Sequence, residues 1–152
     1  MADHVSVTTE IAAPAEAVWA MVADLTRMHE WSPENDAVTW TQGATTAQPG
    51  ATFKGTNSAG TKKWATKGTV VEAVPGRVFS FRITAGPMKV ALWSYRIEPI
   101  DAGCAVTESW DDERGALVTV AGKFVTGVSD RASHNRAGME ATLRNLKAAA
   151  EV

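Results

Sequence analysis

Glu108 is the residue of this sequence whose position most strongly suggests chemistry. Around it the chain alternates, with Val106, Glu108 and Trp110 on one face of an expected strand and small or polar residues on the other. If the bulky face points inward, the carboxyl is buried, which costs several kcal/mol unless it is paired or protonated. A raised pKa or a strong partner then follows, and both are typical of functional groups. The alternatives are that a twist or bulge turns Glu108 to solvent, or that it pairs with an arginine.

Tryptophan is the second unusual feature. The chain has six tryptophans but only one tyrosine and four phenylalanines. An indole is large and rarely fully buried, and it offers a broad apolar surface with one N–H donor, which suits the wall of a ligand pocket. The alternative is that these residues serve only the core and the surface of a sheet.

The sequence lacks the residue patterns of metal sites, phosphate-binding loops and catalytic nucleophiles. His4, His29 and His134 are scattered, and neither Cys104 nor a pair of carboxylates completes a metal-ligand set with them. The sequence contains no G-x-G-x-x-G phosphate loop and no G-x-S-x-G nucleophile motif. We therefore expect neither a metal nor a cofactor.

The elements that position these residues can be predicted from periodicity. His4–Ile11 alternates as a half-buried strand, and a helix over residues 14–25 begins at Pro14. We expect a second short helical turn over Thr26–Trp31. It ends at Ser32-Pro33 because the residue before proline avoids the helical region.

The middle of the chain predicts a meander of antiparallel strands joined by Gly- and Pro-containing turns. The expected strands are Ala37–Gln42, Ala51–Asn57, Lys63–Val74, Arg77–Thr84, Val90–Ile100 and Cys104–Asp111. Alternation predicts which side chains face inward. The inward set is Phe53, Gly55, Asn57, Phe79, Phe81, Ile83, Trp93, Tyr95 and Ile97. Trp64 is a weaker prediction, because both faces of its strand mix apolar and charged residues.

Helical periodicity returns after Gly115. One apolar stripe contains Leu117, Val120, Phe124 and Val128, and a long terminal helix starts near Asp130. Its expected inner face consists of Ala132, Arg136, Met139, Leu143, Leu146 and Ala150. The resulting order is β-α-α-β6-α, an α+β fold in which the long helix covers the apolar face of the sheet. If the sheet curves away from that helix, the unfilled space is a pocket.

Size and charge limit the class of protein. The chain has 152 residues, which suits one domain over residues 1–152. Fifteen Lys and Arg against seventeen Asp and Glu give a formal charge of −2, so no general attraction to nucleic acid is expected. No apolar run is long enough to span a membrane. Met1 to His4 show no export signal, so we expect a cytoplasmic protein, either a monomer or a homodimer.

Four short segments, taken together, resemble a known superfamily. They are Ile11–Trp19 (IAAPAEAVW), Trp31–Glu34 (WSPE), Trp93–Pro99 (WSYRIEP) and Val106–Trp110 (VTESW) with Gly103 before it. This order and spacing is similar to the START-like (SRPBCC, Bet v 1-like) superfamily, most of all its bacterial polyketide cyclase/dehydrase and lipid-transport branch. The resemblance covers nearly the whole chain. It implies a helix-grip fold, in which a seven-stranded antiparallel sheet curves around a long C-terminal helix and encloses a cavity for apolar ligands.

The resemblance and the residues together define a candidate site. The expected ligand-binding residues are Trp31, Phe53, Asn57, Trp64, Phe79, Phe81, Trp93, Tyr95, Glu108, Trp110, Asn135 and Met139. Arg131 is expected near the cavity mouth and His134 at the surface or as a capping residue. Glu34 is a further polar candidate beside Trp31, and a solvated loop explains it equally well. Glu108 is the only candidate for a catalytic residue.

Three functions remain open, because fold does not decide function. The first and favoured one is the binding or transport of a small lipid-like or polyketide-like molecule in an internal cavity. The second is an enzyme of the cyclase or dehydratase type, in which Glu108, with Tyr95 or Asn57, moves protons. The third is a protein–protein module that uses the tryptophans or the segment 115–127, which is also a candidate for a movable lid.

Overall fold

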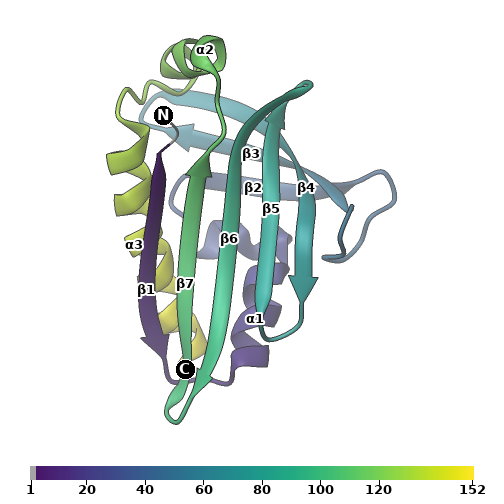
Figure 1. Cartoon of the computed structure of the whole chain (residues 1–152), viewed down its shortest axis with the longest axis vertical. Helices are drawn as coiled ribbons and strands as arrows, with labels where there is room; N and C mark the ends of the chain where they lie inside the picture. Colours follow the sequence, from purple (N-terminus) through teal and green to yellow (C-terminus); the bar gives the residue numbers. More distant parts are fainter. Residues whose placement is uncertain (1–2) are drawn as a thin grey trace.

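The computed structural model describes residues 3–152, and its centre is one antiparallel sheet of seven strands (Figure 1). The strands are β1 (His4–Ile11), β2 (Asn35–Thr41), β3 (Thr52–Ala59), β4 (Lys62–Val74), β5 (Val78–Ala85), β6 (Met88–Ile100) and β7 (Gly103–Asp112). The helices are α1 (Ala15–Ala23), the 3-10 helix η1 (Leu25–Glu30), α2 (Ala116–Thr126) and α3 (Arg131–Ala150). The order β-α-α-β6-α is present, with α2 as an additional helix between β7 and α3.

The strand order in the sheet is β1-β7-β6-β5-β4-β3-β2. Each strand from β2 to β6 pairs with the next strand in the sequence. β1 pairs with β7 and forms the second edge of the sheet. Short Gly-containing turns between the strands favour this meander, as the sequence predicts.

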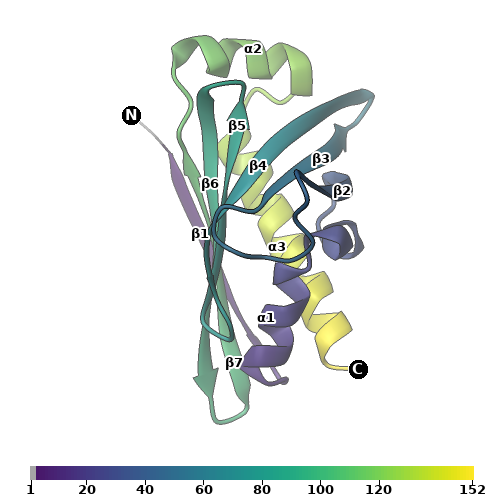
Figure 2. The same ribbon diagram turned by 90° about the vertical axis from the view of Figure 1, so that its right-hand side faces the viewer.

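The helices lie on the concave side of the sheet and cover its two ends differently. Helix α3 runs along that side, α1 packs at one end and α2 lies across the opposite end (Figure 2). Strands β2, β3 and the start of β4 curl toward α3, so the sheet wraps partly around the helix (Figure 2). The described residues include no helix that is both long and apolar enough to cross a membrane.

The end near α1 is filled by a hydrophobic core. Phe79, Ile97 and Val106 of the sheet are almost inaccessible, and they belong to one cluster with Leu143 and Leu146 of α3. Apolar burial of this kind contributes roughly 1.5–3 kcal/mol for each large side chain. This core holds the C-terminal half of α3 against the sheet.

The inner face of α3 differs from the predicted one at its start. Asn135 is buried where the sequence favoured Arg136, and Arg136 is exposed. Asp130 caps the helix by accepting a hydrogen bond from the Ser133 backbone N–H. The first turns of α3 therefore present the Asn135 amide, rather than the Arg136 guanidinium, to the space between helix and sheet.

Candidate functional site

A cavity of about 1270 Å³ lies between the sheet and α3, at the end away from the hydrophobic core. Its floor is formed by deeply buried residues, among them Tyr95, Trp110 and Met139. Its outer wall is formed by exposed residues of α2 and of the β3–β4 and β5–β6 hairpins, such as Leu117, Gly60 and Met88. The cavity therefore opens at the α2 end of the molecule.

Glu108 lies at the floor of this cavity and is 3% exposed. The Tyr95 hydroxyl donates a hydrogen bond to Glu108 Oε2 at 3.0 Å. Among the residues that the structure describes, nothing pairs with Glu108 Oε1. The inward orientation is one of the alternatives that the sequence left open, and it leaves one oxygen of a buried carboxyl group without a hydrogen-bond partner.

Burial controls the charge of this carboxyl. Desolvation raises the pKa of Glu108 to about 8, and the hydrogen bond from Tyr95, which favours the charged form, offsets only part of this effect. The pKa of Tyr95 is raised well above its usual value, first by burial and then by the neighbouring Glu108. Near neutral pH the pair is therefore predominantly uncharged, and Glu108 carries a proton that it can donate.

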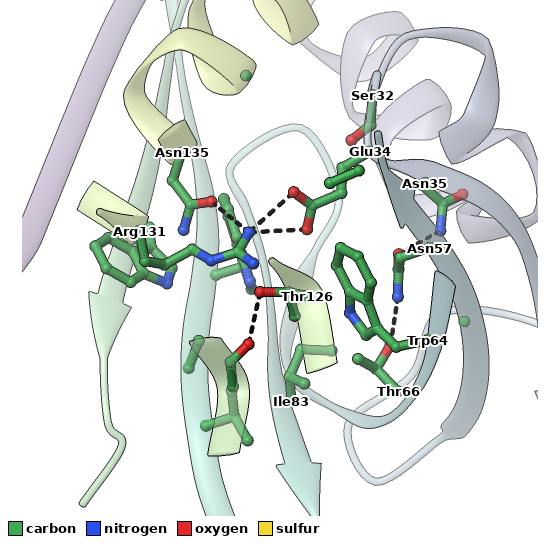
Figure 3. A pocket seen from close by; sticks show the side chains of 18 of the residues that line it. Ser32, Glu34, Asn35, Asn57, Trp64, Thr66, Ile83, Thr126, Arg131 and Asn135 are labelled. Carbon is green, nitrogen blue, oxygen red and sulfur yellow. Dashed lines mark hydrogen bonds and ion pairs between the residues drawn. The ribbon is translucent and has the colours of Figure 1, made fainter. Parts of the chain in front are cut away.

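A second polar group, which includes an ion pair, borders the cavity where α3 begins (Figure 3). Arg131 Nη1 donates to both carboxylate oxygens of Glu34, at 3.0 and 2.9 Å, and to Asn135 Oδ1 at 3.2 Å. His134 Nε2 lies 2.6 Å from Glu34 Oε2. The Arg131 guanidinium also lies 5.8 Å from the centre of the Trp64 ring, within the range of a cation–π interaction. This group links α3 to the η1–β2 loop.

A third polar group belongs to the curled strands (Figure 3). Asn35 Nδ2 donates to Asn57 Oδ1 at 3.3 Å, and Asn57 Nδ2 donates to Thr66 Oγ1 at 3.2 Å. Asn35 Oδ1 is buried and finds no partner within residues 3–152. The cavity wall thus carries a second unsatisfied acceptor besides the Glu108 carboxyl.

The structure places most of the predicted site residues on the cavity wall. These are Phe53, Asn57, Trp64, Phe81, Trp93, Tyr95, Glu108, Trp110, Asn135 and Met139. Trp31 and Phe79 instead lie in the packed core, each almost inaccessible. Both follow the inward pattern of their elements, but they sit at the filled end of the molecule, where α1 and the second half of α3 leave no space.

The family described as "Polyketide cyclase / dehydrase and lipid transport" matches residues 2–151. The chain belongs to this family. A search of curated proteins found no match that would refine the assignment.

Solved structures show that this member of the family has the helix-grip fold. A Polyketide_cyc-like protein of Corynebacterium glutamicum is 28% identical, with 99% of this chain and 90% of that chain covered and a TM-score of 0.62. The di-domain ARO/CYC StfQ of the steffimycin biosynthetic pathway is 14% identical, with coverage of 99% and 52% and a TM-score of 0.74. Major latex-like protein 151 of Panax ginseng is 12% identical, with coverage of 98% and 97% and a TM-score of 0.73.

Sequence reasoning missed several polar residues of this family member's cavity, among them Asn35, Thr66 and Thr142. Thr66 could have been found, because it shares a face with Trp64 two residues earlier. Asn35 lies before the predicted start of its strand, and a register shift separates it from Ala37. The alternating pattern of the apolar residues in that strand therefore could not predict whether Asn35 faces inward.

The site offers no cluster for a metal ion. The residues that the structure describes contain no group of three or more His, Cys, Asp or Glu side chains arranged to hold one. The polar groups that line the cavity include the neutral Glu108 carboxyl, amides and hydroxyls, and the charged residues among them include the paired Arg131, Glu34 and Arg114 and the lysines 54 and 67. Such a set suits hydrogen bonding to an organic molecule of mixed polarity.

Proposed function

We propose that the protein binds a small, largely apolar molecule in this cavity and holds one polar group of the molecule at Glu108. The observation that carries the proposal is a deep cavity with an uncharged, half-paired carboxyl at its floor. Ligand sites are concave and mostly apolar, with a few polar groups that fix orientation. A lipid-like or polyketide-like molecule with a hydroxyl or carbonyl group fits this description.

The size of the cavity supports a ligand of substantial length or several rings. Its volume of about 1270 Å³ exceeds the roughly 300–1,000 Å³ of ordinary small-molecule pockets. The aromatic walls formed by Phe53, Phe81 and Trp93 provide contact area. A ligand with polar groups at two points would gain affinity from hydrogen bonds to Glu108 and to Asn35 Oδ1.

Mass spectrometry of compounds extracted from the natively purified protein tests the proposal. We expect an apolar compound to co-purify and to displace a fluorescent apolar probe, 8-anilinonaphthalene-1-sulfonate, from the cavity. Gly138 on α3 lines the cavity and has open space where a side chain would begin. Gly138→Phe should therefore place a ring inside the cavity and weaken binding, whereas the matched variant Gly138→Ala should bind normally. Equal binding of the probe by both variants would contradict a cavity site.

A second candidate function is proton transfer of the cyclase or dehydratase type. Acid–base catalysis is most effective when the pKa of the group lies near the working pH, and the pKa of Glu108 at about 8 meets this condition. Glu108→Gln separates the two functions. A carrier with this variant should keep its affinity, because the amide still hydrogen-bonds, whereas an enzyme should keep affinity and lose turnover.

A further inference from the structure

Helix α2 exposes large apolar side chains on the outside of the molecule. Leu117 is 72% exposed and Phe124 is 78% exposed, and Val120 between them is also exposed. These three residues follow the predicted stripe, which in the structure does not pack into the core. Monomeric proteins rarely leave contiguous apolar side chains of this size in water unless the surface has a use.

The cavity does not account for this surface. The residues of α2 that line the cavity are Leu117, Val118, Ala121, Gly122, Val125 and Thr126, although Leu117 and Val125 are also exposed to solvent. Successive helical residues are offset by about 100°, so Val120 and Phe124 point away from that side, and Leu117 lies at the border. The helix is therefore apolar on more of its circumference than a roof over the cavity needs.

Four lysines without a salt bridge among the described residues lie on α2 or on strands at the same end of the molecule. Lys123 lies on α2 itself, the Lys62 side chain packs against Gly127 at the end of α2, and Lys63 follows it on β4. The β5–β6 hairpin adds Lys89 beside the exposed Met88 at the same end of the molecule (Figure 1). The salt bridges of the described residues involve none of these four lysines.

The acidic residues closest to α2 in the sequence are already neutralised or used. Asp112 pairs with Arg114 at 2.9 Å, Glu113 pairs with Arg82 at 2.8 Å, and Asp130 caps α3. Asp3, Asp112 and Asp130 line a small surface hollow together with Lys123, so acidic groups lie beside that lysine. Lysines 62, 63 and 89 lie outside the hollow, and although the whole chain carries a formal charge of −2, they add positive charge at this end.

We propose that the α2 face, defined as Leu117, Val120 and Phe124 with the rim lysines 62, 63, 89 and 123, docks on the surface of an anionic lipid bilayer. Apolar side chains of an amphipathic helix enter the boundary between headgroups and acyl chains, while lysines meet lipid phosphates. Protein interfaces are depleted in lysine, and two copies of this face would bring eight like charges together. A bilayer therefore fits the chemistry better than a protein partner or a second copy.

Flotation of the purified full chain with vesicles tests this proposal. We expect binding to vesicles of phosphatidylcholine with 30% phosphatidylserine, little binding to phosphatidylcholine alone, and weakening with salt. The double variant Leu117→Ser/Phe124→Ser should lose about tenfold or more in partitioning, and each lysine changed to Gln about fivefold. Val74→Ser, which changes an exposed apolar residue outside the α2 face, is the matched control and should bind like the wild type.

Three outcomes would overturn the proposal. They are no binding to anionic vesicles, unchanged binding by the Leu117→Ser/Phe124→Ser variant with its circular dichroism preserved, and a concentration-dependent dimer that this variant abolishes. The last outcome would assign the α2 face to self-association instead. Docking and cavity binding can be separated, because Gly138→Phe places a ring inside the cavity without touching the α2 face and should still float with the vesicles.

Discussion

Tyr95 and Glu108 are directly opposite each other on β6 and β7, and both side chains point into the cavity. The strand register alone thus brings the hydroxyl within 3.0 Å of Glu108 Oε2. Side chains of a directly opposed antiparallel pair stand about 4.5–5.5 Å apart at Cβ, so a long acid and a tyrosine meet without distortion. The sheet positions the carboxyl at the cavity floor, and one of its oxygens has no partner among the described residues.

The first prediction concerns stability against pH. In the folded protein Glu108 stays protonated up to a pKa of about 8, whereas in the unfolded chain it ionises near its usual 4.5. Between these values the unfolded state binds fewer protons, so the contribution of Glu108 to the free energy of unfolding is fully present below about pH 4.5 and falls until about pH 8. Glu108→Gln should remove this slope.

Urea unfolding at pH 5, 7 and 9 measures the effect. The variant should gain on the wild type as pH rises, by on the order of a few kcal/mol over the whole window. Glu98→Gln, at an exposed position of β6, serves as the control. Parallel stability curves for the wild type and Glu108→Gln would show that the carboxyl ionises normally in the folded protein.

The second prediction concerns the hydrogen bond itself. Tyr95→Phe removes the donor that lowers the pKa of Glu108, so that pKa should rise further. The variant should lose about 1 kcal/mol at pH 6 and more at pH 9, where the buried carboxylate has lost its partner. Adding Glu108→Gln to Tyr95→Phe should abolish the extra loss at pH 9, which a double-mutant cycle measures. An equal loss at both pH values would mean that the Tyr95 hydroxyl does not stabilise the charged form of Glu108 more than the neutral form.

Alternation predicted the inner face of β5 and β6 because these strands bury bulky residues on one side through most of their length. Phe81 and Tyr95 are buried on the cavity wall as that pattern indicates. The long apolar spacing after Asp130 likewise predicted the terminal helix. In these elements each local preference agrees with the final packing, so the sequence is informative without knowledge of the neighbours.

Other parts of the site depend on contacts that alternation does not report. In β4 the register shifts between Val70 and Glu72, so inward and outward positions exchange midway and both faces of the strand look mixed. The Arg131–Glu34 pair joins residues 97 positions apart in the sequence. Whether inward residues meet a cavity or a core, as for Trp93 against Phe79, depends on where α1 and α3 leave space.

The third prediction compares two arginines of similar local chemistry. Arg131 pairs with Glu34 beside Trp64, and Arg27 pairs with Glu30 beside Trp31. The side chains of the first pair are 13% and 28% exposed, and those of the second are both 42% exposed. Because water and salt weaken exposed pairs, Arg27→Gln should cost less than about 1 kcal/mol. Arg131→Gln should cost about 1.5–3 kcal/mol, since it also releases Glu34 and Asn135.

Thermal unfolding in low and high salt measures this contrast. Salt should weaken the Arg27 contribution more strongly, because charges at the surface are better screened. Similar losses for both variants would show that Arg131 and Glu34 form no stronger link between α3 and the η1–β2 loop than an ordinary surface pair.

The last prediction concerns Gly68, a glycine against which an aromatic side chain of the cavity wall packs. Gly68 on β4 is opposite Phe53 on β3, and a Cβ at Gly68 would lie 2.2 Å from Phe53 Cζ. The ring cannot move away freely, because it is buried and packs edge-on against Phe81 with ring centres 5.4 Å apart. Gly68→Ala should therefore cost about 1–3 kcal/mol of unfolding free energy and displace the ring into the cavity.

The opposite sign is expected for the same substitution on α3. Gly138 has open space at its Cβ position and lies inside the helix, so Gly138→Ala should stabilise the protein by about 0.5–1 kcal/mol. Urea unfolding of both variants, with probe binding measured in parallel, separates backbone preference from steric conflict. A Gly68→Ala protein as stable as Gly138→Ala would mean that Phe53 does not rest on the β4 backbone, and the aromatic wall of the cavity would then be mobile rather than fixed.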